Sequence, residues 1–233
     1  MIKNKNHMFY KRKEQNRVPE RKVLIVTEGE KTEINYFKGM IDDLNIGWVE
    51  LKHEEPTPDR VAETALRMYE KEERKGSKYT AVYCVMDRDN HQSFKKTLEK
   101  IKRNQAKGMT IYAVVSVPSF EYWFLLHFQY STKSYETIGK VSAGDDVKHD
   151  LNELMGKKLG CEYSKTDNEI YTKLKPYLLK AEKNAKLVEE HDKIAESFNP
   201  YTNVYQLTQC FRDKFENKIK VVVPDIEAIC KKK

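Results

Sequence analysis

The sequence predicts an α/β fold, in which a parallel sheet flanked by helices is followed by a mainly helical C-terminal region. Strand-like and helix-like segments alternate four times between residues 22 and 128, which is typical of a parallel sheet with helical crossovers. Two of the strand-like segments, residues 79–86 and 110–117, contain no charged side chain. Such uncharged, β-branched runs indicate strands that are buried on both faces. Beyond about residue 145 the apolar spacing is mostly helical.

The first half of the predicted sheet begins with a short β-branched strand at residues 22–27. Apolar side chains at helical spacing then predict a helix over residues 32–44. A weaker, partly exposed strand is expected at 46–53. Thr57 is a favourable N-cap and Pro58 is favourable at the first helical position, so the next helix should begin there.

The second half of the sheet continues with the central strand, residues 79–86, and a helix that carries Phe94, Leu98 and Ile101. The strand at 110–117 ends before Pro118, and an apolar helix should follow over residues 120–128. We place an α/β domain at residues 22–131 and a helical region packed on it at residues 132–233.

The C-terminal region is expected to contain several helices. The first carries apolar side chains between Val147 and Leu159. Thr166 and Glu169 have the spacing of a capping box, which predicts a helix start, and Pro176 should kink or interrupt that helix. A further helix should follow Asn199-Pro200, and residues 218–223 are expected to form a short late strand.

Composition excludes several classes of protein. In the 233 residues no apolar run approaches the roughly 20 residues that cross a bilayer. The N-terminus has basic residues without a following apolar segment, so a secretory signal is not expected. The four cysteines are far apart and include no C-x-x-C pair, which favours reduced thiols in the cytoplasm over a zinc site or a disulfide framework.

Most of the net charge of +7 lies in a basic N-terminal arm, residues 1–21. Such an arm beside a nearly neutral body favours contact with the phosphates of DNA or RNA. The alternative is a tail that only keeps the protein soluble. The candidate nucleic-acid-binding residues of the arm are Lys11, Arg12, Lys13 and Arg17.

Acidic side chains follow three predicted strands, at the point where each strand ends. They are Glu28, the pair Asp87 and Asp89, and Glu121. In a parallel sheet these positions meet at one edge, where the carboxylates repel each other unless a cation offsets them. Oxygen ligands suit one or two Mg²⁺ or Mn²⁺ ions, which can activate water against a phosphodiester. Gly29 would allow the backbone to approach a phosphate closely.

The Asp87–Asp89 pair has a simpler alternative, a solvated loop in which Asp89 caps the following helix. Ser119 is expected to cap the helix after it rather than bind metal. His127 lies among apolar residues and is expected to be a core histidine rather than a general base.

These motifs resemble the Toprim catalytic pattern in its OLD-nuclease form, E-G, then D-x-D, then S-x-E. The sequence is also similar to RloB-like proteins of bacterial phage-defence and abortive-infection loci. The RloB-like motifs E-G-x-x-T-E-x-x-Y-F, P-x-F-E-x-W-x-L-L-H-F, Y-x-K-T-D and N-P-x-T-x-V occur here at residues 28–37, 118–128, 163–167 and 199–204.

The resemblance implies a Toprim-like fold and a metal-dependent nuclease. By this resemblance Glu28 is an acid–base group or first metal ligand, Asp87 and Asp89 hold metal, and Glu121 completes the site. Toprim nucleases often have an acid four residues after the first Glu; that position is Thr32 here, and Glu33 is the candidate ligand instead. The alternative for Glu33 is a first-turn carboxylate favoured by the helix dipole.

The Y-x-K-T-D motif makes Lys165 a candidate for stabilising a phosphate in the transition state. Solvated lysine is the alternative for both Lys165 and Lys173. Because no P-loop is present, the resemblance implies a separate ATPase subunit as a possible partner. The rival function is a non-catalytic subunit that binds nucleic acid or a partner protein; a primase or strand-passing enzyme would need modules that we do not find.

Overall fold

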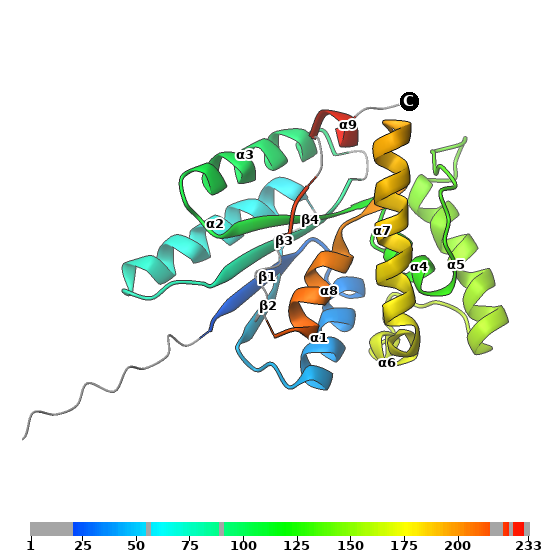
Figure 1. The fold of residues 1–233 in the computed structure, drawn as a ribbon, viewed down its shortest axis with the longest axis horizontal. Helices are drawn as coiled ribbons and strands as arrows, with labels where there is room; N and C mark the ends of the chain where they lie inside the picture. Colours follow the sequence, from blue (N-terminus) through cyan, green and yellow to red (C-terminus); the bar gives the residue numbers. More distant parts are fainter. Residues whose placement is uncertain (1–20, 55–56, 89–90, 215–220, 224–225, 231–233) are drawn as a thin grey trace, which may run out of the picture.

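The computed structural model describes residues 21–54, 57–88, 91–214, 221–223 and 226–230. Within these residues a five-stranded sheet lies between helices on both faces (Figure 1). The elements are β1 (Val23–Thr27), α1 (Thr32–Leu44), β2 (Val49–His53), α2 (Pro58–Arg74), β3 (Ala81–Asp87), α3 (Phe94–Ala106), β4 (Ile111–Val117), α4 (Glu121–Phe128), α5 (Ala143–Leu159), α6 (Ile170–Leu174), α7 (Leu178–Ala195), β5 (Tyr201–Thr202), α8 (Val204–Arg212) and α9 (Ile226–Cys230).

The sheet has the order β2-β1-β3-β4-β5, and β1 to β4 run parallel, which confirms the predicted parallel sheet flanked by helices. Thr27 at the end of β1 pairs with Val85 of β3, and Asp87 at the end of β3 pairs with Ser116 of β4. The carboxyl ends of these three strands therefore lie at one edge. The short strand β5 is antiparallel to β4, with Tyr201 opposite Val117.

Side chains of the strands alternate between two cores because successive residues of a strand point to opposite faces. Leu24 and Val26 of β1 face the core that is shared with α2 and α3. Val23 and Ile25 face the larger core, to which α1, α4, α5, α7 and α8 contribute. In Figure 1, α2 and α3 accordingly lie on one side of the sheet and α1 and α8 on the other.

The apolar helix α4 is the centre of the larger core, and all eight of its residues are buried. It packs against α5 and α7, so helices from the C-terminal region enclose the residues that follow β4. β5, which also comes from that region, extends the sheet beside β4. The division between residues 131 and 132 stays a prediction, although both sides of it contribute to one core.

His127 of α4 is a core histidine, as predicted. Its side chain is fully buried, and its Nδ1 lies 2.9 Å from the carbonyl oxygen of Trp123. A carbonyl oxygen only accepts, so Nδ1 carries the hydrogen. Burial lowers the pKa of His127 to about 4, and hydrogen bonding to the backbone of Trp123 and Phe124 opposes this only in part.

Of three local predictions for the C-terminal region, one is confirmed and two need correction. Pro176 does interrupt a helix, since a 3₁₀ turn at Lys175–Tyr177 separates α6 from α7. The capping box is wrong: α6 begins only after Glu169, whose backbone N–H donates to Oδ1 of Asp167 at 3.0 Å. The part of the predicted late strand that is described, residues 221–223, is not a strand.

None of the helices in the described part of the chain combines the length and the apolar character that a bilayer crossing requires.

The buried imidazole predicts a specific acid sensitivity. Because the pKa of His127 is lowered in the folded state, only the unfolded state binds a proton between about pH 6.5 and 4, so stability falls across this window as the pH falls. His127→Asn keeps a donor near Nδ1 and does not titrate. Relative to wild type, its free energy of unfolding should rise by about 3 kcal/mol between pH 7.5 and pH 4.

Urea denaturation at a series of pH values measures this difference. His149→Asn on α5, where the side chain is exposed, is the control and should follow wild type. If the free energy of unfolding of His127→Asn changes with pH in parallel with that of wild type, the prediction is wrong.

Candidate functional site

An open acidic cavity of about 440 Å³ lies at the carboxyl edge of the sheet. It brings together six residues that the sequence singled out: Glu28, Gly29, Glu33, Asp87, Glu121 and Lys165. Glu30, Lys31, Thr32, His91 and Phe120 complete its lining. Asp89 and the four basic residues of the arm, Lys11, Arg12, Lys13 and Arg17, lie outside the described residues.

Glu28, directly after β1, is held in place by the neighbouring strand β3. Its backbone N–H donates to the carbonyl oxygen of Val85 at 3.1 Å, which continues the parallel ladder. Its Oε2 accepts a hydrogen bond from the backbone N–H of Asp87 at 3.1 Å. Its Oε1 lies 3.4 Å from Nε2 of His91. The carboxylate is therefore oriented from β3 and from the loop that follows β3.

Gly29 makes room for the carboxylate of Glu33. A Cβ atom at residue 29 would lie 1.9 Å from Oε2 of Glu33, which is well inside van der Waals contact. Glu33 is in the first turn of α1, where the dipole favours an acid, but its side chain is also buried in the cavity. The contact of Gly29 with a phosphate stays a prediction.

The pKa of Glu33 is raised to about 7. Burial is the largest cause, and the negative charges of Glu121 and Glu28 raise it further, while backbone hydrogen bonds at Glu33 and Gly29 oppose the change. These carboxylates are therefore close enough to disfavour one another's ionisation.

Asp87, the last residue of β3, has the least satisfied carboxylate of the cavity. Its Oδ1 is buried and has no hydrogen-bond partner among the described residues. Burial raises the pKa of Asp87 well above its usual range, and the charges of Glu33, Glu121 and Glu28 add to the effect. An unpartnered buried carboxylate oxygen costs free energy that a bound cation would recover.

Glu121, the first residue of α4, is positioned from the C-terminal region. Its Oε1 accepts a hydrogen bond from the hydroxyl of Tyr163 at 3.1 Å, and the same hydroxyl lies 3.1 Å from Oγ1 of Thr32 in α1. The backbone N–H of Tyr163 donates to Oδ1 of Asn152 in α5 at 2.7 Å. Tyr163 thus connects α1, α4 and α5 at the cavity.

Lys165 lies at the rim of the cavity. Its Nζ is 4.0 Å from Oε1 of Glu121, and its side chain is 58% exposed. A lysine in this position contacts both solvent and the acidic cluster. Lys173, the other candidate, instead forms an ion pair with Asp167 at 2.7 Å and does not line the cavity.

Ser119 does not cap α4. The residue before the helix is Phe120, no side-chain cap is formed, and Oγ of Ser119 is buried without a hydrogen-bond partner among the described residues. Only the backbone carbonyl of Ser119 contributes, by accepting from the N–H of Tyr122.

Tyr163, Thr32 and His91 were not identified from the sequence as parts of the site. Tyr163 belongs to a motif that was noticed for its lysine, and its 42-residue separation from Glu121 gives no local signal. His91 was available to sequence reasoning, because it lies in the loop after β3 that carries the predicted acids.

The carboxylates of Glu28, Glu33, Asp87 and Glu121 have the chemistry of a divalent-cation site. They supply oxygen ligands of the kind that Mg²⁺ and Mn²⁺ prefer, and Asp87 Oδ1 has no other partner among the described residues. As they stand, no three Asp, Glu, His or Cys side chains of the described residues are arranged to hold an ion. Asp89, the remaining predicted ligand, lies outside the described residues.

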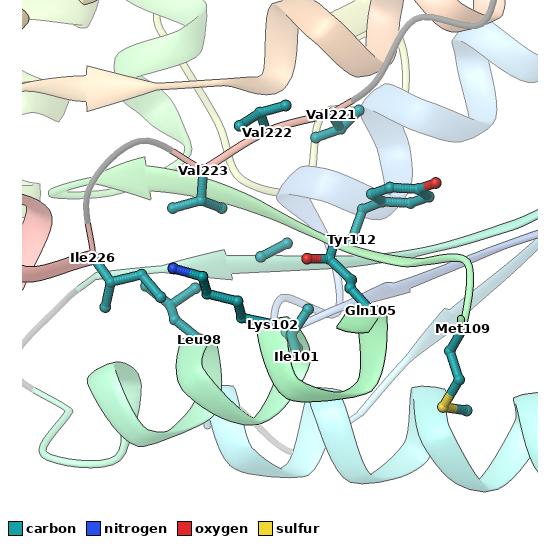
Figure 2. Close-up of a pocket in the computed structure, with 11 residues that line it drawn as sticks. Leu98, Ile101, Lys102, Gln105, Met109, Tyr112, Val221, Val222, Val223 and Ile226 are labelled. Atoms are coloured by element: carbon teal, nitrogen blue, oxygen red, sulfur yellow. The ribbon is translucent and has the colours of Figure 1, made fainter. Parts of the chain in front are cut away.

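A second cavity, of about 360 Å³, has a different character (Figure 2). Its walls are mainly apolar side chains from α3, from Val221, Val222 and Val223, and from Ile226, with Lys102 as the charged side chain. No carboxylate belongs to its described lining. The chemistry that the sequence predicts therefore belongs to the acidic cavity.

Comparison with known families assigns the chain. The sequence model of the family described as RloB-like protein matches residues 23–210, from β1 into α8. The chain belongs to the RloB-like family. Every described residue that lines the acidic cavity falls inside the matched range. No curated protein and no solved structure matches the chain.

Crowding of the carboxylates predicts a stability cost without metal. Because the pKa of Asp87 is raised in the folded state, the unfolded state ionises first and stability falls as the pH rises from about 4. In EDTA at pH 8, Asp87→Asn should therefore have a higher free energy of unfolding than wild type. The gain should disappear toward pH 4.

Chemical denaturation in EDTA at both pH values measures the effect. Asp42→Asn, an exposed acid on α1, makes the same change outside the cavity and should show no gain. An Asp87→Asn protein less stable than wild type at pH 8 would contradict the prediction.

Proposed function

We propose that this RloB-like protein is a metal-dependent nuclease that hydrolyses phosphodiester bonds of DNA or RNA. The observation that carries the proposal is the acidic cavity, where α1, β3, α4 and the residue directly after β1 each contribute a carboxylate around one opening. The unpartnered Oδ1 of Asp87 supports it, because a folded chain keeps such an atom at a cost that a ligand offsets.

The ligands of one or two Mg²⁺ or Mn²⁺ ions would be Glu28, Glu33, Asp87 and Glu121, together with Asp89 from outside the described residues. When bound, such ions supply a water of lowered pKa and charge stabilisation for a phosphodiester. The Toprim-like assignment of the fold belongs to this proposal and rests on the order E-G, D-x-D and S-x-E along the chain.

The chain's own residues have separate roles in this proposal. Glu28 orients the reacting water or takes its proton, because its carboxylate is fixed from Asp87 and His91. Lys165 binds a phosphate oxygen from the rim, where its amine is accessible and beside Glu121. Thr32 and Tyr163 hold Glu121 in position.

The biological setting that we propose is bacterial anti-phage defence of the abortive-infection type, in the cytoplasm, together with a separate ATPase subunit. The support is the set of RloB-like motifs and the family assignment.

A non-catalytic subunit that binds nucleic acid or a partner protein is the second candidate. One observation favours it: the described Asp, Glu, His and Cys side chains are not arranged to hold an ion as they stand.

Cleavage assays with matched variants distinguish the two functions. Labelled single-stranded DNA, double-stranded DNA and tRNA are incubated with Mg²⁺, Mn²⁺ or EDTA. Wild type should cleave at least one substrate only with metal, and Glu28→Gln should reduce the rate by a factor of about 100 or more. Glu136→Gln is the matched control: it makes the same change at an exposed side chain that does not line the acidic cavity, and should cleave like wild type.

Metal binding is measured separately from cleavage, by the effect of Mn²⁺ on the melting temperature. A rise in wild type that Asp87→Asn abolishes would support the metal site even if the substrate tested is wrong. No cleavage together with no effect of Mn²⁺ would refute the nuclease and favour the binding subunit.

The basic arm is expected to act in binding rather than in chemistry. A chain that begins at Lys22 loses the charges of Lys11, Arg12, Lys13 and Arg17, so its dissociation constant for nucleic acid should rise and the salt dependence of binding should become less steep. Fluorescence anisotropy at several salt concentrations measures both. An unchanged salt dependence would identify the arm as a solubilising tail.

A further inference from the structure

The outer face of α7 carries an exposed apolar stripe. Leu179, Leu187 and Ile194 are 66%, 41% and 87% exposed. The opposite side of the same helix is buried against α4 and α8 through small and branched side chains such as Ala181, Ala185 and Val188. In Figure 1, α7 runs along the front of the molecule with no other element drawn over it.

Two charged residues are interleaved with the apolar ones. Besides Lys180, Lys186, His191, Lys193 and Ala195, the exposed residues of the helix include Leu179, Lys183, Leu187, Glu190 and Ile194, which follow one another in steps of three or four residues. At about 100° per residue all five fall within a stripe about 80° wide. Lys183 and Glu190 form no ion pair within the described residues, although lysines and acids elsewhere on α7 do.

This order is self-complementary when the helix is reversed. Lys183 and Glu190 are equally far from the point between Lys186 and Leu187, and so are Leu179 and Ile194. In an antiparallel pair of α7 helices centred on that point, each lysine therefore lies level with a glutamate. Both ends of the stripe then bring leucine level with isoleucine.

We propose that the outer face of α7 binds a second copy of this chain, with the two helices antiparallel across a two-fold axis near Lys186 and Leu187. A two-fold interface uses the same patch on both subunits, so its pattern must match its own reversal. The stripe meets that condition in both charge and apolarity. Burial of the three apolar side chains supplies the affinity, and the lysine–glutamate pairs fix the orientation.

Like charges also come level in this arrangement: Lys180 with Lys193, and the two copies of Lys186 beside the axis. Nζ of Lys180 donates to the carbonyl oxygen of Phe128. Nζ of Lys193 forms an ion pair with Glu189 at 2.6 Å. The carbonyl oxygen is neutral and does not offset the charge of Lys180, whereas Glu189 offsets that of Lys193.

Charge reversal tests the interface and its orientation together. Lys183→Glu places two glutamates level at both ends of the contact, and Glu190→Lys places two lysines there. Each variant alone should dimerise at least about tenfold more weakly than wild type. Mixed together, the two variants restore opposite charges at both positions and should form a heterodimer about as tight as wild type.

Sedimentation equilibrium of wild type, of each variant and of the mixture measures these constants. Lys71→Glu on α2 is the control, because it makes the same change at an exposed lysine on another helix and should dimerise like wild type. Circular dichroism establishes that the variants are folded.

The outcomes are distinct from those of the nuclease assays. If each variant alone dimerises weakly and their mixture dimerises like wild type, the antiparallel contact is established. A wild type that stays monomeric up to its solubility limit would overturn the proposal and leave the stripe for a different partner. A dimer that neither reversal weakens would place the interface elsewhere.

Discussion

The parallel register of β1, β3 and β4 is the constraint on which the site depends. Pairing Thr27 with Val85 and Asp87 with Ser116 brings the ends of the three strands to one edge. The residues that follow are acids, so the hydrogen bonds of the sheet hold together side chains that repel each other. The raised pKa values of Asp87 and Glu33 result first from burial and then from the charges that this arrangement brings together.

The helical C-terminal region contributes to the same site rather than only covering the sheet. Tyr163 reaches Glu121 and Thr32 from the segment between α5 and α6, and Lys165 follows it at the rim. Helix α4, which begins with Glu121, is buried against α5 and α7. The packing of the larger core therefore also fixes the position of the Glu121 carboxylate.

Sequence reasoning succeeded where the signal is local and repeated. The uncharged runs located β3 and β4 well, and helical spacing gave the bounds of α1, Thr32–Leu44. It failed where the signal is short or non-local. The two residues of β5 are too few to show a period of two. The Thr166–Glu169 spacing does not start a helix, because the backbone N–H of Glu169 bonds to Asp167 in a local turn instead. Contacts of Tyr163 with Thr32 and Glu121 exist only after folding.

The glycine after β1 has a consequence for how the sequence can vary. The motif E-G suggests a glycine kept for a ligand, yet the space beside its Cα is filled by the carboxylate of Glu33. An alanine there would push against an acid of its own chain before any substrate arrived. A side chain at residue 29 would therefore act on the site by moving the flexible end of Glu33, so this glycine determines where that carboxylate lies in the cavity.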